Sequence, residues 1–209
     1  MAKKITALKA QKHNPDRVSV YLDDEYAFGL YRVVAAWLAV GQELDEEKIR
    51  QLNQTEASEK AYQRALNFLS YRVRTESEIR RNLNKHDTPE SVIEDVLERL
   101  RRIKLVNDLE FANTWVENRS EFRPRGRRAL RSELRQKGVD QEIIEESLQD
   151  LNEEELAYQA AKKNVRKYLR FEWPEFRKKL LGFLARRGFN YAVAAPVVER
   201  VWAEEQDNT

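Results

Sequence analysis

Lysine and arginine side chains are concentrated in three stretches of this 209-residue chain. Residues 72–85 carry five basic and two acidic side chains, residues 119–137 carry eight and two, and residues 162–187 carry ten and two. Guanidinium and ammonium groups in such runs bind phosphates and carboxylates, and contact with nucleic-acid phosphates makes binding salt-dependent. The chemistry that these stretches indicate is therefore binding of a polyanion.

The candidate contacts with an anionic partner are inferred from charge and share a place in or near the basic stretches. They are Arg72, Arg74, Arg80, Arg81, Arg123, Arg125, Arg127, Arg128, Arg131, Arg135, Lys137, Lys162, Lys163, Arg166, Lys167, Arg177, Lys178, Arg186 and Arg187. The alternative is that basic and acidic helices solvate opposite surfaces or pair with each other between repeats. Residues 138–161, for example, hold eight acidic and no basic side chains. Surface pairs of that kind contribute only about 0–1 kcal/mol each.

Three arginines stand at the expected start of a helix, where the helix dipole favours negative charge. Arg125, Arg127 and Arg128 follow Pro124 in the middle basic stretch. Their charge opposes the dipole by a few tenths of a kcal/mol each, roughly. Local stability does not explain these arginines, whereas an external anionic partner would.

Aromatic side chains flank the basic turns. Tyr71, Phe122, Phe171 and Trp173 lie there. Such rings can stack on nucleic-acid bases, but we expect them to pack beneath the turns.

No arrangement of side chains in the sequence predicts catalysis. The chain has no cysteine, and neither His13 nor His86 stands beside a second ligand at metal-binding spacing. The six glycines are scattered and form no phosphate-binding loop. We therefore expect a protein that is not an enzyme and that uses no metal and no cofactor.

The basic stretches recur because the chain repeats itself with a period of about fifty residues. Leu134-Arg-Gln-Lys-Gly-Val aligns with Leu184-Ala-Arg-Arg-Gly-Phe and with Leu83-Asn-Lys-His-Asp-Thr. Asn107 with Glu110 has capping-box spacing for one helix, and Gly138 suits the left-handed residue that ends the next. These signals predict three copies of a three-helix unit.

The N-terminal segment has a different pattern. Residues 5–12, 18–22 and 26–30 are predicted strands separated by turn clusters, which indicates a small antiparallel sheet. Three strands need a cover, and a helix over residues 31–40, ended by Gly41, is expected to supply it with Val33, Val34, Trp37 and Leu38.

The predicted fold class is mainly α: a tandem array of three three-helix repeats forming a curved, elongated solenoid, with a small N-terminal antiparallel sheet plus helix. The expected segments are an extension at 1–54 and repeats at 55–106, 107–151 and 152–209, the last with a tail from Gln206. Equivalent helices line up in such an array, so the basic ones would form a stripe. No apolar run is long enough to span a membrane, and no signal peptide is recognised. We expect a cytoplasmic protein.

Three segments resemble, in the same order, motifs of the bacterial RecX regulators of the RecA recombinase. They are Leu69-Ser-Tyr-Arg-Val-Arg-Thr-Glu-Ser-Glu-Ile, Asn107-Asp-Leu-Glu-Phe-Ala and Leu134-Arg-Gln-Lys-Gly-Val. The resemblance covers roughly residues 58–203, and the N-terminal β segment resembles an extension that some members carry. His86-Asp87-Thr88 departs from the Lys-Gly-Ile-like turn that is usual in the family.

This resemblance implies a non-enzymatic regulator that binds RecA filaments on single-stranded DNA and lies along the filament groove. It implies restraint of ATP hydrolysis, strand exchange and co-protease activity in DNA repair and the SOS response. We expect a monomer whose partners are the RecA filament and single- or double-stranded DNA with weak sequence preference, and no membrane. The alternatives are a direct nucleic-acid-binding repeat protein and a helical adaptor for another protein. RecA binding without DNA separates the regulator from the direct binder, and a flat salt dependence favours the adaptor.

Overall fold

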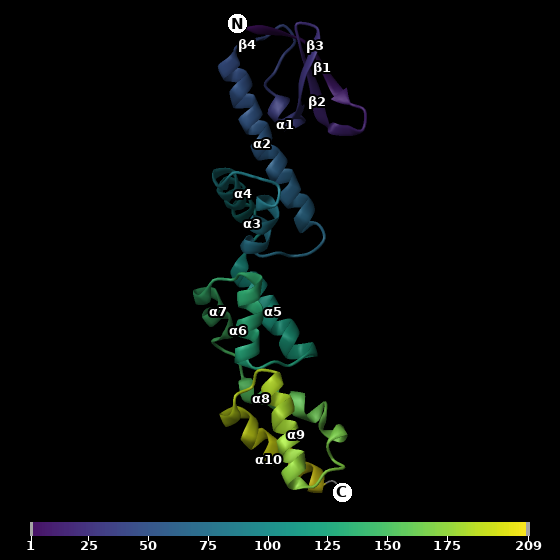
Figure 1. The fold of residues 1–209 in the computed structure, drawn as a ribbon, viewed down its shortest axis with the longest axis vertical. Helices are drawn as coiled ribbons and strands as arrows, with labels where there is room; N and C mark the ends of the chain where they lie inside the picture. The colour runs from purple at the N-terminus through teal and green to yellow at the C-terminus, as the bar shows by residue number, and fades with distance from the viewer. Residues whose placement is uncertain (1, 208–209) are drawn as a thin grey trace. The chain divides into compact units, whose positions relative to one another are not determined.

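The computed structural model describes residues 2–207 and is mainly helical, with one small sheet near the N-terminus (Figure 1). It consists of two compact units: residues 2–72 and 79–105 form unit 1, and residues 73–78 and 106–207 form unit 2. The mainly α fold and the N-terminal antiparallel sheet are thereby confirmed, while the curvature of the array and the four segment boundaries stay predictions. Within residues 2–207 no helix combines the length and apolarity needed to cross a membrane.

The sheet of unit 1 has four strands in the order β3-β2-β1-β4, and all neighbours are antiparallel. The strands are β1 (Lys3–Gln11), β2 (Asn14–Leu22), β3 (Glu25–Tyr31) and β4 (Glu43–Leu44). Ile5, Val20, Leu30 and Leu44 are fully buried on one face. The three predicted strands are confirmed. The two-residue strand β4 was not predicted, because it is too short to show an alternating pattern.

The predicted covering helix over residues 31–40 is wrong in length. Helix α1 comprises only Arg32–Ala35, and Trp37 is 87% exposed. The chain instead turns at Gly41 (φ 96°), whose N–H donates to the carbonyl of Ile5, and then enters β4. Ile49 and Leu52 complete the cover, because the start of α2 (Glu46–Leu69) packs on the sheet core.

The first repeat is built from the second half of α2 together with α3 (Glu76–Asn84) and α4 (Glu90–Arg102). One continuous helix, capped by Asp45, runs through the expected boundary at residues 54–55. Ala61 and Ala65 are buried on α2, as are Ile93 and Leu97 on α4. The α3 helix begins in unit 2 and continues into unit 1.

Unit 2 contains two more three-helix repeats, each with its own core. The middle repeat comprises α5 (Asp108–Phe122), α6 (Arg127–Lys137) and α7 (Gln141–Leu148) around buried Phe111, Leu130, Leu134 and Ile144. The last repeat comprises α8 (Glu153–Lys162), the 3-10 turn η1 (Val165–Lys167), α9 (Trp173–Arg186) and α10 (Tyr191–Asp207). The expected C-terminal tail is helical through Asp207, and its last two positions lie outside the described residues.

The predicted helix-end signals at Asn107 and Gly138 are confirmed, and two further caps follow the same pattern as Asn107. The side chains of Asn107, Asp140 and Asn152 each accept a hydrogen bond from a backbone N–H in the first turn of their helix. Gly138 has φ 80°, the left-handed conformation that ends α6. In the first repeat the equivalent residue is Asp87, with φ 55°. The departure from the family turn therefore keeps the same backbone shape.

Within unit 2, the C-terminal ends of α6 and α9 each accept a hydrogen bond from the start of the second helix of the preceding repeat. The Thr75 hydroxyl, at the start of α3, donates to the carbonyl of Lys137 at 2.7 Å. The Gly126 N–H, at the start of α6, donates to the carbonyl of Arg187 at 2.9 Å. Each junction therefore joins the positive end of one helix dipole to the negative end of another.

A second hydrogen bond recurs at both junctions. The N–H of Glu76 donates to the carboxylate of Asp108, and the N–H of Arg127 donates to the carboxylate of Glu153, each at 2.9 Å. Both carboxylates belong to the first residue of the next repeat's first helix. An acidic residue there satisfies an amide that a helix start leaves without an intrahelical partner.

Candidate anion-binding surface

Part of the predicted basic surface is paired inside the repeats. Arg131 on α6 donates two hydrogen bonds to Glu145 on α7, at 2.8 and 2.7 Å. These bonds hold the pKa of Glu145 below its usual value. At the equivalent place in unit 1, Arg80 on α3 pairs with Glu94 on α4. These arginines therefore pair with acidic helices, but within a repeat and not between repeats as the alternative expected.

Other candidate cations also have internal partners. Those near carboxylates are Lys137 with Glu78 at 3.4 Å, Lys162 with Glu205 at 2.6 Å, and Arg177 with Glu199 at 3.9 Å. Those bonded to side-chain amides are Arg135 with Gln141 at 2.8 Å and Lys167 with Asn164 at 3.0 Å. The carboxylates offset much of the positive charge of the first group.

Arg127 has a structural role that the sequence interpretation missed. Its guanidinium donates to the carbonyl of Leu148 at 2.6 Å and to that of Leu151 at 3.3 Å. The Leu148 carbonyl belongs to the last turn of α7, where helical acceptors have no intrahelical donors, and the Leu151 carbonyl lies in the loop that follows. The expectation that local stability explains none of the arginines at this helix start is therefore wrong for Arg127.

Three arginines gather at the junction between the second and third repeats. Arg123 and Arg125 lie in the loop before α6, and Arg187 lies at the end of α9. The Arg187 Nη1 donates to the carbonyl of Pro124 at 3.3 Å, which holds its head group against that loop. Burial, followed by the charges of Arg125 and Arg123, lowers the pKa of Arg187. We call these three residues the junction arginine cluster.

Acidic groups compensate little of this charge. Arg125 Nε lies 3.6 Å from Glu133, whose other oxygen takes a 2.9 Å bond from Arg119. Within residues 2–207, Arg187 makes no ion pair, and the side chain of Arg123 makes neither a hydrogen bond nor an ion pair. Glu133, which is shared with Arg119, is thus the one carboxylate that offsets the repulsion among these three charges within residues 2–207.

The preceding junction shows why this cluster is unusual. Lys137 occupies the position equivalent to Arg187, and its ammonium group pairs with Glu78 in the first turn of α3. The position equivalent to Glu78 in α6 is Ala129, and the first turn of α6 contains no acidic residue. The same architecture is therefore neutralised at one junction and left positive at the other.

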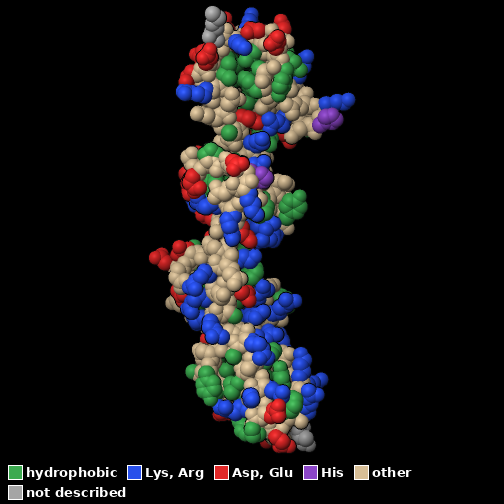
Figure 2. Space-filling view, viewed as in Figure 1, with side chains coloured by type: hydrophobic (Ala, Val, Ile, Leu, Met, Phe, Trp, Pro, Cys, Tyr) green, Lys and Arg blue, Asp and Glu red, His purple; other side chains and the backbone are tan. Residues whose placement is uncertain are grey.

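Further cations surround the cluster or lie nearby in unit 2, where Lys and Arg side chains are prominent in Figure 2. Lys163 Nζ donates to the carbonyl of Glu121 at 3.1 Å, and Arg128 donates to the carbonyl of Ala185 at 3.0 Å, so both charges lack a carboxylate. Other exposed cations without a hydrogen bond or ion pair to the described part of the chain are Arg166, Lys178 and Arg186.

The remaining candidates belong to the first basic stretch. Arg72 and Arg81 are exposed, and Arg74 is half-buried. That these three join the junction arginine cluster in one stripe stays a prediction.

Two aromatic side chains beside the basic turns are exposed, contrary to the packing that we expected. Tyr71 is 76% exposed and Phe122 is 64% exposed. Each begins the same four-residue pattern, an aromatic residue followed by arginine, a variable residue and arginine. Phe171 and Trp173 do pack against the core of the last repeat, as expected.

The described residues contain no group of three or more His, Asp or Glu side chains placed to hold a metal ion. What this surface offers chemically is electrostatic and hydrogen-bonding recognition of anions.

Comparison with known proteins covers nearly the whole chain. Family models match at residues 3–45 (regulatory protein RecX N-terminal domain), 61–100 (RecX, first three-helix domain), 107–148 (RecX, second three-helix domain) and 152–198 (RecX, third three-helix domain). The chain is 34% identical over 208 residues to the regulatory protein RecX of Bacillus velezensis, covering 97% of this chain and 79% of that protein. It is 35% identical over 215 residues to the one of Limosilactobacillus reuteri, covering 98% and 80%.

Solved structures give the same result. A crystal structure of regulatory protein RecX matches with a TM-score of 0.79 and 33% identity, covering 94% of this chain and 99% of that one. A crystal structure of RecX from Lactobacillus salivarius matches with a TM-score of 0.65 and 26% identity, covering 70% and 97%.

Proposed function

The chain belongs to the RecX family of regulatory proteins, and we propose that it is a non-enzymatic modulator of the RecA recombinase. In this proposal it binds RecA filaments on single-stranded DNA and restrains ATP hydrolysis, strand exchange and co-protease activity, as part of DNA repair and SOS regulation. It acts as a monomer in the cytoplasm. Family membership supports the regulatory role, and the surface of unit 2 supports an anionic partner.

The observation that carries the proposal is the junction arginine cluster. A guanidinium does not lose its proton in proteins, so Arg187 cannot relieve its repulsion with Arg123 and Arg125 by becoming neutral. An external phosphate or carboxylate relieves it, and charge-assisted hydrogen bonds to such groups are about twice as strong as neutral ones. A RecA filament on DNA offers both kinds of anion.

The decisive experiment measures RecA-catalysed ATP hydrolysis on single-stranded DNA while this protein is titrated. We expect hydrolysis to fall with increasing protein, and we expect the purified protein to turn over no ATP alone. Unchanged RecA activity at saturating concentration, or ATP turnover by the protein itself, contradicts the proposal.

A second candidate function, direct binding of single-stranded nucleic acid, is favoured by the exposed ring of Phe122. A ring beside Arg123 offers a face for base stacking next to a phosphate contact. Binding of a fluorescent oligothymidylate without RecA tests it, with Phe122→Ala as the variant and Tyr26→Ala, an exposed ring on β3, as the control. An equal loss of oligothymidylate binding in both variants argues against stacking on Phe122. That result favours the recombinase as the primary partner, as does RecA binding without DNA that Phe122→Ala leaves unchanged.

A further inference from the structure

A pocket of about 340 Å³ lies in unit 1 between α2 and the turn that joins α3 to α4. Four basic side chains line it: Lys60 and Arg64 on α2, and Lys85 and His86 on the turn. Within residues 2–207 none of the four side chains makes a hydrogen bond or an ion pair. Asp87 is the one acidic residue in the lining, so the pocket carries net positive charge.

Apolar side chains also contribute to the lining of the pocket. Ala57 and Ala61 lie on the same face of α2 as Lys60 and Arg64, because the four positions follow the i, i+3, i+4, i+7 spacing of one helical face. Pro89 and Val92, at the start of α4, also line it. A ligand that fits has a compact anionic group for the basic side chains and a part that can lie against the apolar ones.

In the two other repeats, the equivalent turn packs against the preceding repeat. In unit 2 the equivalent turn at Gly138 lies against Ser77, and that at Gly188 lies against Ala129, so a preceding repeat covers each one. Lys137, the equivalent of His86, then pairs with the carboxylate of Glu78. The first repeat follows the sheet instead of another repeat, and Asp87 is the one carboxylate among the residues that line the pocket at its turn.

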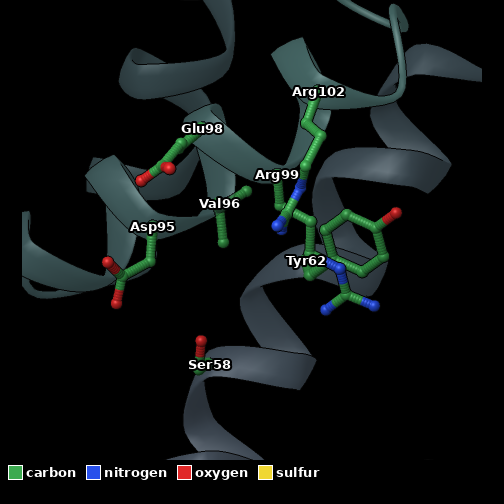
Figure 3. A pocket seen from close by; sticks show the side chains of 7 residues that line it. All are labelled: Ser58, Tyr62, Asp95, Val96, Glu98, Arg99 and Arg102. Carbon is green, nitrogen blue, oxygen red and sulfur yellow. The ribbon is translucent and has the colours of Figure 1, made fainter.

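A second pocket, between α2 and α4, differs in its charge. Figure 3 shows the side chains of α2 and α4 that line it, including Tyr62, Asp95 and Arg99. Arg99 bonds to buried Glu59 at 2.7 Å and lies 3.4 Å from the ring centre of Tyr62. The lining of that pocket has two acidic and two basic side chains, so its charge does not favour binding of an anion.

From this charge and shape we propose that the pocket of Lys60, Arg64, Lys85 and His86 binds the phosphate group of a nucleotide. Arginine offers a planar fork and lysine a mobile point charge, which together suit a phosphoryl group that carries more than one negative charge. The apolar residues of the lining, Ala57, Ala61, Pro89 and Val92, can take the base or the sugar. A free nucleotide and a strand of nucleic acid present this same chemistry, so the two sources are separated by experiment.

The test uses the whole chain and isothermal titration with ATP, inorganic phosphate and a short oligothymidylate. We expect ATP or the oligothymidylate to bind, and the double variant Lys60→Gln with Arg64→Gln to weaken that binding at least about tenfold. Lys48→Gln, which removes an exposed charge from α2 outside the pocket, is the control and should change affinity less than about twofold. Binding of ATP points to a free nucleotide, and binding of the oligothymidylate alone points to a strand; either supports the site.

Absence of binding for all three probes overturns the inference, as does equal binding by the double variant. His86→Gln is a second variant should the first one unfold, because its exposed side chain makes no bond within residues 2–207. Substitution of Arg123 in unit 2 should leave this binding unchanged, so failure here is distinct from failure of the RecA proposal.

Discussion

The hydroxyl of Thr75 donates a 2.7 Å hydrogen bond to the carbonyl of Lys137, 62 residues further along the chain. Thr75 also accepts the N–H of Glu78 as the cap of α3, so one fully buried hydroxyl serves the start of one helix and the end of another. The bond brings Gly138 against Ser77, where a Cβ on the glycine would lie 2.2 Å from the serine oxygen.

Gly138→Ala should therefore destabilise unit 2 by about 1–3 kcal/mol, through its positive φ and the close approach to Ser77. Gly182→Ala is the matched control: it lies within α9, and its added Cβ would meet only the flexible end of Arg186 at 3.4 Å. We expect that control to gain about 0.5–1 kcal/mol from helix propensity. Urea denaturation measures both, and equal effects would contradict the packing at this junction.

Arg127→Gln should lower the free energy of unfolding by about 1.5–3 kcal/mol, because its charged head group bonds to the carbonyls of Leu148 and Leu151. Arg128→Gln, one residue away, breaks only an exposed bond to Ala185 and should cost less than about 0.5 kcal/mol. Thermal and urea unfolding of the two variants measure this difference in stability. If both lose the same stability, Arg127 does not bind the end of α7 in solution.

Arg123→Gln should weaken binding to RecA–DNA filaments at least about fivefold, which is about 1 kcal/mol. Arg131→Gln removes the same charge from a residue paired with Glu145, and we expect it to change binding less than about twofold. The difference should shrink as salt rises, because screening weakens exposed charge contacts. Stability of Arg123→Gln should not fall, since repulsion with Arg187 is relieved. Equal binding by wild type and both variants would place the contact elsewhere.

The last repeat should lose stability in acid through Glu204. A hydrogen bond from Tyr158 and further bonds from Arg200 and Lys162 hold the pKa of Glu204 below its usual value. A carboxyl whose pKa is lower when folded stabilises the fold fully above its unfolded pKa, about 4.3, and loses that contribution as the pH falls through the folded pKa. Unfolding measured from about pH 6 to about pH 3 should show a shallower acid decline for Glu204→Gln than for wild type. An identical decline in both would rule out this contribution.

Local signals explain why much of the fold was predictable. The caps at Asn107, Asp140 and Asn152 and the left-handed Gly138 depend on residues within one turn, so sequence spacing is sufficient. The covering helix failed because its apolar spacing resembles a helix while Trp37 faces solvent. The spacing of apolar residues does not show which of them pack against the core.

The candidate site was predictable in composition only. Charge counts identified the basic stretches, but whether a cation has a partner depends on residues far along the chain. Arg131 pairs with Glu145, and Arg127 donates to backbone carbonyls. Arg187 is repelled by the charge of Arg123, which lies 64 positions earlier in the chain. The repeat alignment contained one usable signal: Glu78 in the first repeat is replaced by Ala129 in the second.

The continuous helix α2 has a consequence for how unit 1 folds. Ile49 and Leu52 on its first half pack on the sheet, and Ala61 and Ala65 on its second half are buried in the first repeat. One ladder of backbone hydrogen bonds spans both cores, so loss of either one leaves half of the helix with an uncovered apolar face. The sheet and the first repeat should consequently melt in a single cooperative transition, and removal of the sheet should leave the first repeat prone to aggregate.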